Sequence, residues 1–148
     1  FTREVLMPAI AEGAEKAGRS PDAVDLIGAP FLALARDEEG VEAAKRDLKQ
    51  HISFYASTPT YHSVLEFHDW MDAAAELHRL SREGQWKAMP DVITDAMLDE
   101  WAIIATADEF VERVEEKCGG LYSTILLDLP GGFRSDDDWV RENVGRLK

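Results

Sequence analysis

Apolar residues recur every three or four positions through much of this chain, which is the pattern of helices with one buried face. The clearest example runs from Asp37 to Ser57, where the charged residues fall on the stripe opposite the apolar one. Pro59 ends this predicted helix, because proline has no N–H and disfavours helical geometry in the residue before it. The same pattern predicts helices over Thr2–Ala17, Met71–Arg82 and Thr94–Trp101, another from Thr106 to Gly119, and a last helix that Ser135 caps and that contains Trp139 and Val144.

Two stretches are almost entirely apolar and do not follow the helical period. They are Val24–Leu34 and Leu121–Leu129. A continuous apolar run of this kind is typical of a strand that is buried on both faces in a parallel sheet. We therefore predict two parallel, adjacent strands with helices packed against them, in an α/β fold that is rich in helices.

Two strands do not make a complete sheet with both faces covered. A complete (β/α)8 barrel takes about 250 residues, whereas this chain has 148. We therefore expect the chain to hold part of an α/β domain, or to complete its sheet with another chain. Its first residue is Phe1 rather than methionine, which agrees with a piece of a longer protein.

Charge and composition exclude several classes of partner. The chain has 16 Lys and Arg against 29 Asp and Glu, a net charge of −13, and no basic cluster, so we expect no nucleic acid partner. No apolar run approaches the roughly 18 residues that span a bilayer, and no signal peptide pattern is visible, so we expect no membrane association. The single cysteine, Cys118, favours a reducing cytoplasm, and we predict that it is a small buried thiol at a helix end.

The segment Gln50–Trp70, QHISFYASTPTYHSVLEFHDW, gathers aromatic rings and imidazoles around Pro59. Such a group favours either a lid or pocket wall, or ordinary packing against a neighbouring helix. His62, Glu66 and His68 have a spacing that would suit the start of a metal site, with ordinary surface positions as the alternative. We predict no metal site.

The sequence holds no GxSxG, HExxH, P-loop or GxGxxG pattern. His51 suits a proton donor near a substrate if barrel loops gather beside it, and is otherwise a partly exposed structural histidine. Gly131–Gly132 would let backbone N–H groups meet a phosphate, although a tight turn is the simpler interpretation. We name no catalytic residue.

A series of short stretches carries a family resemblance along essentially the whole chain. In order, they are LMPAIAEG (6–13), IGAPF (27–31), SFYASTPTY (53–61), VLEFHDW (64–70), MPDVITDAML (89–98) and DEFVER (108–113). Taken together, they resemble the C-terminal half of the bacterial luciferase-like flavin monooxygenases, and most closely the deazaflavin-dependent oxidoreductases. One local difference is Ala105-Thr106-Ala107, where family members usually have Gly-Thr-Pro.

The resemblance implies that residues 1–148 form a single unit, the C-terminal portion of a luciferase-like TIM (β/α)8 barrel, with the family's insertion helices at about 59–104. It also implies an oxidoreductase that uses reduced flavin mononucleotide (FMN) or coenzyme F420, in monooxygenation or hydride transfer. The first strands shape most of the flavin pocket in this family and are missing here. We therefore expect that this chain alone binds no cofactor and is inactive.

In barrel enzymes the active face is built from the loops at the carboxyl ends of the strands. That rule selects Phe31–Arg36 and Asp128–Phe133, and also Tyr55–Tyr61 if this segment folds back over the mouth. The candidates for the substrate or cofactor pocket are therefore Phe31, His51, Tyr55 and Tyr61. The cofactor itself performs the redox chemistry, so an apolar and aromatic wall is what the protein needs to supply.

Two functions remain open at this stage. The first is the C-terminal part of a flavin- or F420-dependent oxidoreductase that acts on a small-molecule substrate. The second is a non-catalytic truncated relative or partner-binding α/β module, which the acidic balance favours, because flavin phosphates require cations. In both cases an open strand edge beside the apolar run Ile125–Leu127 predicts association, either with the missing N-terminal half or with a second copy.

Overall fold

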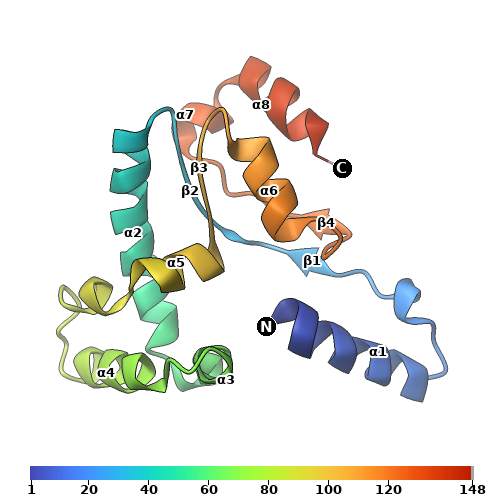
Figure 1. The fold of residues 1–148 in the computed structure, drawn as a ribbon, viewed down its shortest axis with the longest axis horizontal. Helices are drawn as coiled ribbons and strands as arrows, with labels where there is room; N and C mark the ends of the chain where they lie inside the picture. The colour runs from blue at the N-terminus through green and yellow to red at the C-terminus, as the bar shows by residue number, and fades with distance from the viewer. Residues whose placement is uncertain (148) are drawn as a thin grey trace.

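The computed structural model describes residues 1–147 as helices arranged around short parallel strands (Figure 1). The strands are β1 (Ile27–Gly28), β2 (Phe31–Ala35), β3 (Ala102–Thr106) and β4 (Thr124–Ile125). The α-helices are α1 (Met7–Lys16), α2 (Glu38–Ala56), α3 (His62–Phe67), α4 (Met71–Arg82), α5 (Asp95–Trp101), α6 (Phe110–Cys118), α7 (Gly131–Arg134) and α8 (Asp137–Asn143). Single turns of 3-10 helix cover Pro21–Ala23, Pro59–Tyr61, Met89–Val92 and Val144–Arg146, and Thr2–Leu6 forms a π-helical turn before α1.

Strand pairing is parallel throughout the described residues. β2 pairs with β3 over five residues, from Phe31 opposite Ala102 to Ala35 opposite Thr106. β1 pairs with β4 over two residues, Ile27 opposite Thr124 and Gly28 opposite Ile125. The predicted parallel adjacency of the two apolar stretches is therefore confirmed, but only across β1 and β4.

The predicted strand limits were wrong in three respects. Val24–Leu34 is not one strand, because Ala29 and Pro30 separate β1 from β2 and a proline cannot donate to a ladder. Only two residues of Leu121–Leu129 form a strand. The sequence interpretation also missed β3 entirely, which begins at Ala102 directly after α5.

Most of the predicted helices lie close to their expected ranges, and their caps explain why, although α3 and α7 were not predicted and α6 begins only at Phe110. Asp37 begins α2, its Oδ1 accepting the backbone N–H of Gly40 at 2.8 Å, and Thr94 caps α5 in the same way. Gly18 ends the first helix with φ of 68°, a left-handed conformation that glycine adopts without strain. The last helix was assigned the wrong cap: Asp136, not Ser135, accepts the backbone N–H of Trp139, at 3.0 Å.

The β2–β3 pair separates two hydrophobic cores, because successive side chains of a strand point to opposite faces. Ala33 and Ala102 face the first core, which α2, α3, α4, α5 and the Met89–Val92 turn complete. Leu34, Ile103 and Ala105 face the second, which holds α6, α7 and α8. The centre of the second core is Phe110, whose ring lies 5.0 Å from that of Trp139. Both faces of this strand pair are thus covered by helices, as is usual for parallel strands.

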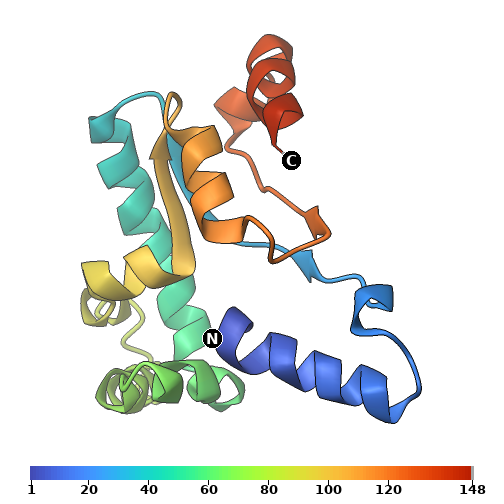
Figure 2. The same ribbon diagram turned by 45° about the vertical axis from the view of Figure 1, so that its right-hand side comes forward.

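Helix α1 lies apart from both cores (Figure 2). It buries only Ala14 among its own residues. Two contacts hold the N-terminal residues that precede α1. Arg3 donates a hydrogen bond to the carbonyl of Gly119 at 2.8 Å, and the ring of Phe1 lies 5.7 Å from that of Phe67. Separately, no helix within residues 1–147 is both long enough and apolar enough to cross a membrane.

Candidate functional site

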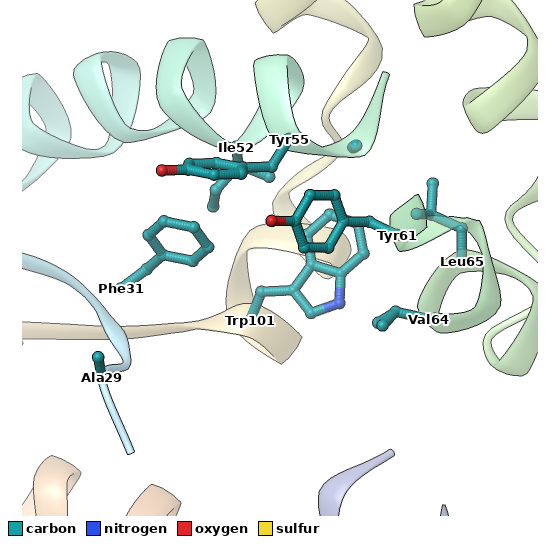
Figure 3. A pocket seen from close by; sticks show the side chains of 9 residues that line it. Ala29, Phe31, Ile52, Tyr55, Tyr61, Val64, Leu65 and Trp101 are labelled. Atoms are coloured by element: carbon teal, nitrogen blue, oxygen red, sulfur yellow. The ribbon is translucent and has the colours of Figure 1, made fainter. Parts of the chain in front are cut away.

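An aromatic cavity of about 420 Å³ lies between the end of α2, the turn into α3 and the start of β2 (Figure 3). This volume is within the range of small-molecule sites in proteins. Within the described residues no charged side chain lines it, although 30% of the whole chain is charged. The residues that line it are Ala29, Phe31, Ile52, Tyr55, Ala56, Tyr61, Val64, Leu65 and Trp101.

Three elements that are distant in sequence bring the rings together. Phe31 is the first residue of β2, and its ring centroid lies 5.9 Å from that of Tyr55 in the last turn of α2. Pro59 then turns the chain, so that Tyr61 meets Tyr55 edge to face at 5.6 Å. Trp101 is the last residue of α5, and Figure 3 shows its indole behind the ring of Tyr61. Edge-to-face pairs at these distances stabilise one another beyond simple burial.

The cavity lies at the amino ends of β2 and β3, and Ala29, which follows β1, also lines it. Helix α2 starts beside the carboxyl end of β2, where Gly40 packs on Ala35, and its last turns return to Phe31 at the amino end. Trp101 directly precedes β3. We expected Tyr55–Tyr61 to belong to the active face only if it folded back over the mouth of the barrel. The segment does not do so, because it does not lie over the carboxyl ends of β2 and β3.

Three polar groups around the cavity lack hydrogen-bond partners within residues 1–147. The indole Nε1 of Trp101 is buried and has no hydrogen-bond partner in the described chain. The hydroxyls of Tyr55 and Tyr61 make no hydrogen bond to any of residues 1–147 either, and their side chains are 40% and 45% exposed. The cavity thus combines an apolar wall with three groups that can donate a hydrogen bond.

The structure brings three of the four sequence candidates together. Phe31, Tyr55 and Tyr61 line the cavity, whereas His51 lies on an exposed side of α2 and does not line it. Their role in binding stays a prediction. Sequence reasoning missed Trp101 and Val64, because α5 and α3 carry them and the spacing of residues along the sequence gives no signal for contacts between separate elements.

The carboxyl ends of the strands carry a different set of side chains. Arg36 follows β2 and pairs with Asp136 at 2.6 Å, while its guanidinium lies 4.4 Å from the ring centre of Phe133. The backbone N–H of Trp139 and the Arg36 guanidinium together hold the pKa of Asp136 below its ordinary value. Arg134 pairs in turn with Asp128 at 2.6 Å. Both arginines at this end therefore already pair with carboxylates on the surface of the described chain.

The histidines do not assemble into a metal centre. His62 faces His78 at 6.4 Å between ring centroids, and His68 instead stacks on Trp70, with its Nε2 3.8 Å from Glu100. Within residues 1–147 no group of three or more His, Cys, Asp or Glu side chains could hold a metal ion.

Two further sequence expectations are resolved by the local structure. Gly131–Gly132 does not form the tight turn of the simpler interpretation, because it begins the single-turn helix α7. Cys118 is confirmed as a buried thiol at a helix end, since it is the last residue of α6 and only 3% exposed, and this burial raises its pKa.

Comparison with known proteins identifies relatives along nearly the whole chain. Residues 2–123 match the model of the luciferase-like monooxygenase family. A protein from Mycobacterium tuberculosis is 35% identical over 126 residues, which are 85% of this chain and 37% of that relative. The 5,10-methylenetetrahydromethanopterin reductase of Archaeoglobus fulgidus is 32% identical over 134 residues, covering 87% of this chain and 39% of the reductase.

A solved structure gives the same result for the fold. The coenzyme F420 dependent tetrahydromethanopterin reductase from Methanopyrus kandleri matches with a TM-score of 0.72 at 23% identity, covering 98% of this chain and 42% of that one. The predicted fold class, an α/β, helix-rich C-terminal part of a TIM barrel, is confirmed. The chain spans about two fifths of the length of the relatives that it matches.

Proposed function

Because this chain belongs to the luciferase-like monooxygenase family, we propose that it is the C-terminal part of an oxidoreductase that transfers hydride with reduced coenzyme F420. The observation that carries this proposal is the match of nearly the whole chain to reductases of one reaction class, one of them named for this coenzyme. The substrate is a small molecule, and residues 1–148 act as one unit of a larger barrel. The lone, buried thiol of Cys118 supports a cytoplasmic location.

The proposed catalytic face lies at the carboxyl ends of the strands, as in other barrel enzymes. After β3, Glu109 accepts hydrogen bonds from the backbone N–H and hydroxyl of Thr106, at 3.1 and 2.8 Å, which fixes the loop between strand and helix. After β2, Arg36 holds the first turn of α8 through Asp136. These contacts give the chain rigid loops with which to shape one side of a substrate pocket.

The residues of this chain do not fit the coenzyme by themselves. The anionic groups of a flavin-type cofactor require cations, and both arginines at the carboxyl ends are paired with carboxylates. We therefore assign the binding of the coenzyme to the larger protein, and we propose that this chain alone is inactive. When bound, the coenzyme supplies the hydride chemistry.

A second candidate is a non-catalytic module, a truncated relative that binds a partner through its open strand edges. The pairing of both arginines favours it, because no uncompensated cation is left at the expected mouth of the described part of the chain. The two candidates differ in one property. Only the first regains coenzyme binding when the rest of a barrel is restored.

A chimera tests the proposal directly. The N-terminal part of the Mycobacterium tuberculosis relative would be joined at Thr2, and reduced and oxidised F420 would be titrated against the chimera, the 148-residue chain and the N-terminal part alone. We expect micromolar binding by the chimera only, followed by stopped-flow oxidation of the bound reduced coenzyme when a substrate is offered. A folded chimera that does not bind F420 would support the second candidate.

A preference for FMN over F420 in the same titrations would contradict the choice of coenzyme and leave the assignment to the family intact. Oxygen uptake separates the two reaction types within the family. Hydride transfer to an organic substrate consumes no oxygen, whereas monooxygenation consumes one molecule per turnover.

A further inference from the structure

We propose that the aromatic cavity at the amino ends of β2 and β3 is a second binding site, for an uncharged, planar aromatic molecule that carries a carbonyl acceptor. This site is separate from the catalytic face proposed above, because Phe31 stands at the start of β2 and Trp101 directly precedes β3. It does not depend on the hydride-transfer proposal, since the cavity is formed entirely by this chain.

The shape and lining of the cavity select a planar aromatic ligand. The cavity has a volume of about 420 Å³, and the rings of Phe31, Tyr55 and Tyr61 line it, with the indole of Trp101 behind Tyr61 (Figure 3). Aromatic walls of this kind bind flat rings by offset stacking and edge-to-face contact. Two of these rings are 40% and 45% exposed, although burial of an aromatic ring is favourable.

The absence of charged side chains from the described lining of the cavity indicates that the ligand is uncharged. No Lys, Arg, Asp, Glu or His is among its lining residues, so neither an anion nor a cation would find a counter-charge there. Moving an unpaired charge out of water into such a site is strongly unfavourable. The net charge of −13 on the chain adds a further penalty for anions.

The carbonyl acceptor follows from the unpartnered donor. The indole N–H of Trp101 is buried without an acceptor in residues 1–147, and an orphaned buried N–H is costly. Figure 3 shows this nitrogen on the side of the indole that faces Val64, while the six-membered ring of the indole lies behind Tyr61. Tyr61 packs on Tyr55, and its hydroxyl makes no hydrogen bond within the described chain. Because the indole nitrogen is buried, neighbouring side chains such as Tyr61 and Val64 must move for a ligand oxygen to reach it.

Three probes of similar size separate these features. Coumarin is neutral and has a carbonyl, naphthalene is neutral and has none, and coumarin-3-carboxylate keeps the ring system but adds a charge. We expect coumarin to bind the 148-residue chain once, with a Kd of roughly 0.1–1 mM for a ligand of this size. Naphthalene should bind about fivefold more weakly, the effect of one net hydrogen bond. The carboxylate should bind more than tenfold more weakly, because nothing compensates its charge.

The indole N–H resonances of the chain report the site directly. The sequence has four tryptophans, and Trp101→Phe identifies the signal that belongs to the cavity. Coumarin should shift that signal downfield, while naphthalene should move it much less. Ala29→Trp fills the cavity from an exposed position and should abolish binding, whereas Tyr122→Phe removes a tyrosine outside the cavity and should leave the Kd unchanged.

Tyr61→Ala provides a second variant should the filled cavity disturb folding, and it should weaken coumarin binding several-fold. Three results would overturn the proposal: no coumarin binding below about 10 mM, binding that survives Ala29→Trp in a folded protein, or equal affinity for coumarin and naphthalene without a shift of the Trp101 signal. The last would describe a plain apolar cleft with no selectivity for an acceptor.

Discussion

Replacement of Phe110 by alanine is expected to remove much of the stability of the second core. The side chain of Phe110 is fully buried, with 0% exposure, and its ring packs against Trp139 at 5.0 Å. Removal of about 150 Å² of apolar surface at about 25 cal/mol per Å² corresponds to about 4 kcal/mol. Core Phe→Ala replacements cost about 3–5 kcal/mol, a large part of the 5–15 kcal/mol that an ordinary domain has.

Equilibrium unfolding in urea measures this loss, followed by far-UV circular dichroism and by the fluorescence of the tryptophans. Phe54→Ala is the matched control, because Phe54 is 53% exposed on α2 and its loss should change the free energy of unfolding by less than about 1 kcal/mol. A loss below about 1.5 kcal/mol for Phe110→Ala, or one equal to that of the control, would refute the second core as described.

Three further predictions concern charge, reactivity and association. Asp136→Asn keeps a capping side chain for α8 but loses the ion pair to Arg36. The fold lowers the pKa of Asp136, so the ionised carboxylate stabilises the folded state at pH values above the pKa of an unfolded aspartate. This stabilisation is lost as pH falls through the lowered pKa of the folded state. Urea melts at neutral and acidic pH should therefore show a difference between wild type and variant that shrinks in acid; a constant difference would contradict this. Cys118, buried and with a raised pKa, should react with a thiol reagent such as DTNB only as fast as the chain opens, and rapid labelling in native buffer would be inconsistent with its position. The exposed Ile27 and Leu126 beside the β1–β4 pair should support concentration-dependent association in sedimentation experiments, which a cooperative monomer across a hundredfold dilution would disprove.

Helix limits could be predicted well because capping and periodicity are local properties. The range Met71–Arg82 was predicted without error, and α2 begins at its acidic cap and ends before Pro59 as expected. β3 was missed for a physical reason. The sequence interpretation ended the helix at Trp101, as observed, but assigned no element to AIIAT, because this run is only five residues long and lies directly between two helices, although Ile103 and Ile104 are β-branched.

Only the part of the site whose residues lie close together in the sequence could be predicted. Tyr55 and Tyr61 lie six residues apart across a proline turn, and their proximity follows from local geometry. Trp101 reaches them through the packing of α5, which no spacing in the sequence encodes. The sequence also does not encode at which end of the strands the cavity lies, because this position depends on the direction in which α2 runs back along β2.

The two cores differ in how much of the chain they require, and this sets an order for folding. All buried members of the first core fall between Ala33 and Ala102, whereas the second combines Leu34 with residues as distant as Trp139. Contacts within a shorter stretch cost less loop entropy and form earlier. The segment from β2 to β3 is therefore a cooperative unit that a nascent chain can complete before its C-terminal helices emerge, and its amide hydrogens should exchange last, while those of α1 exchange first.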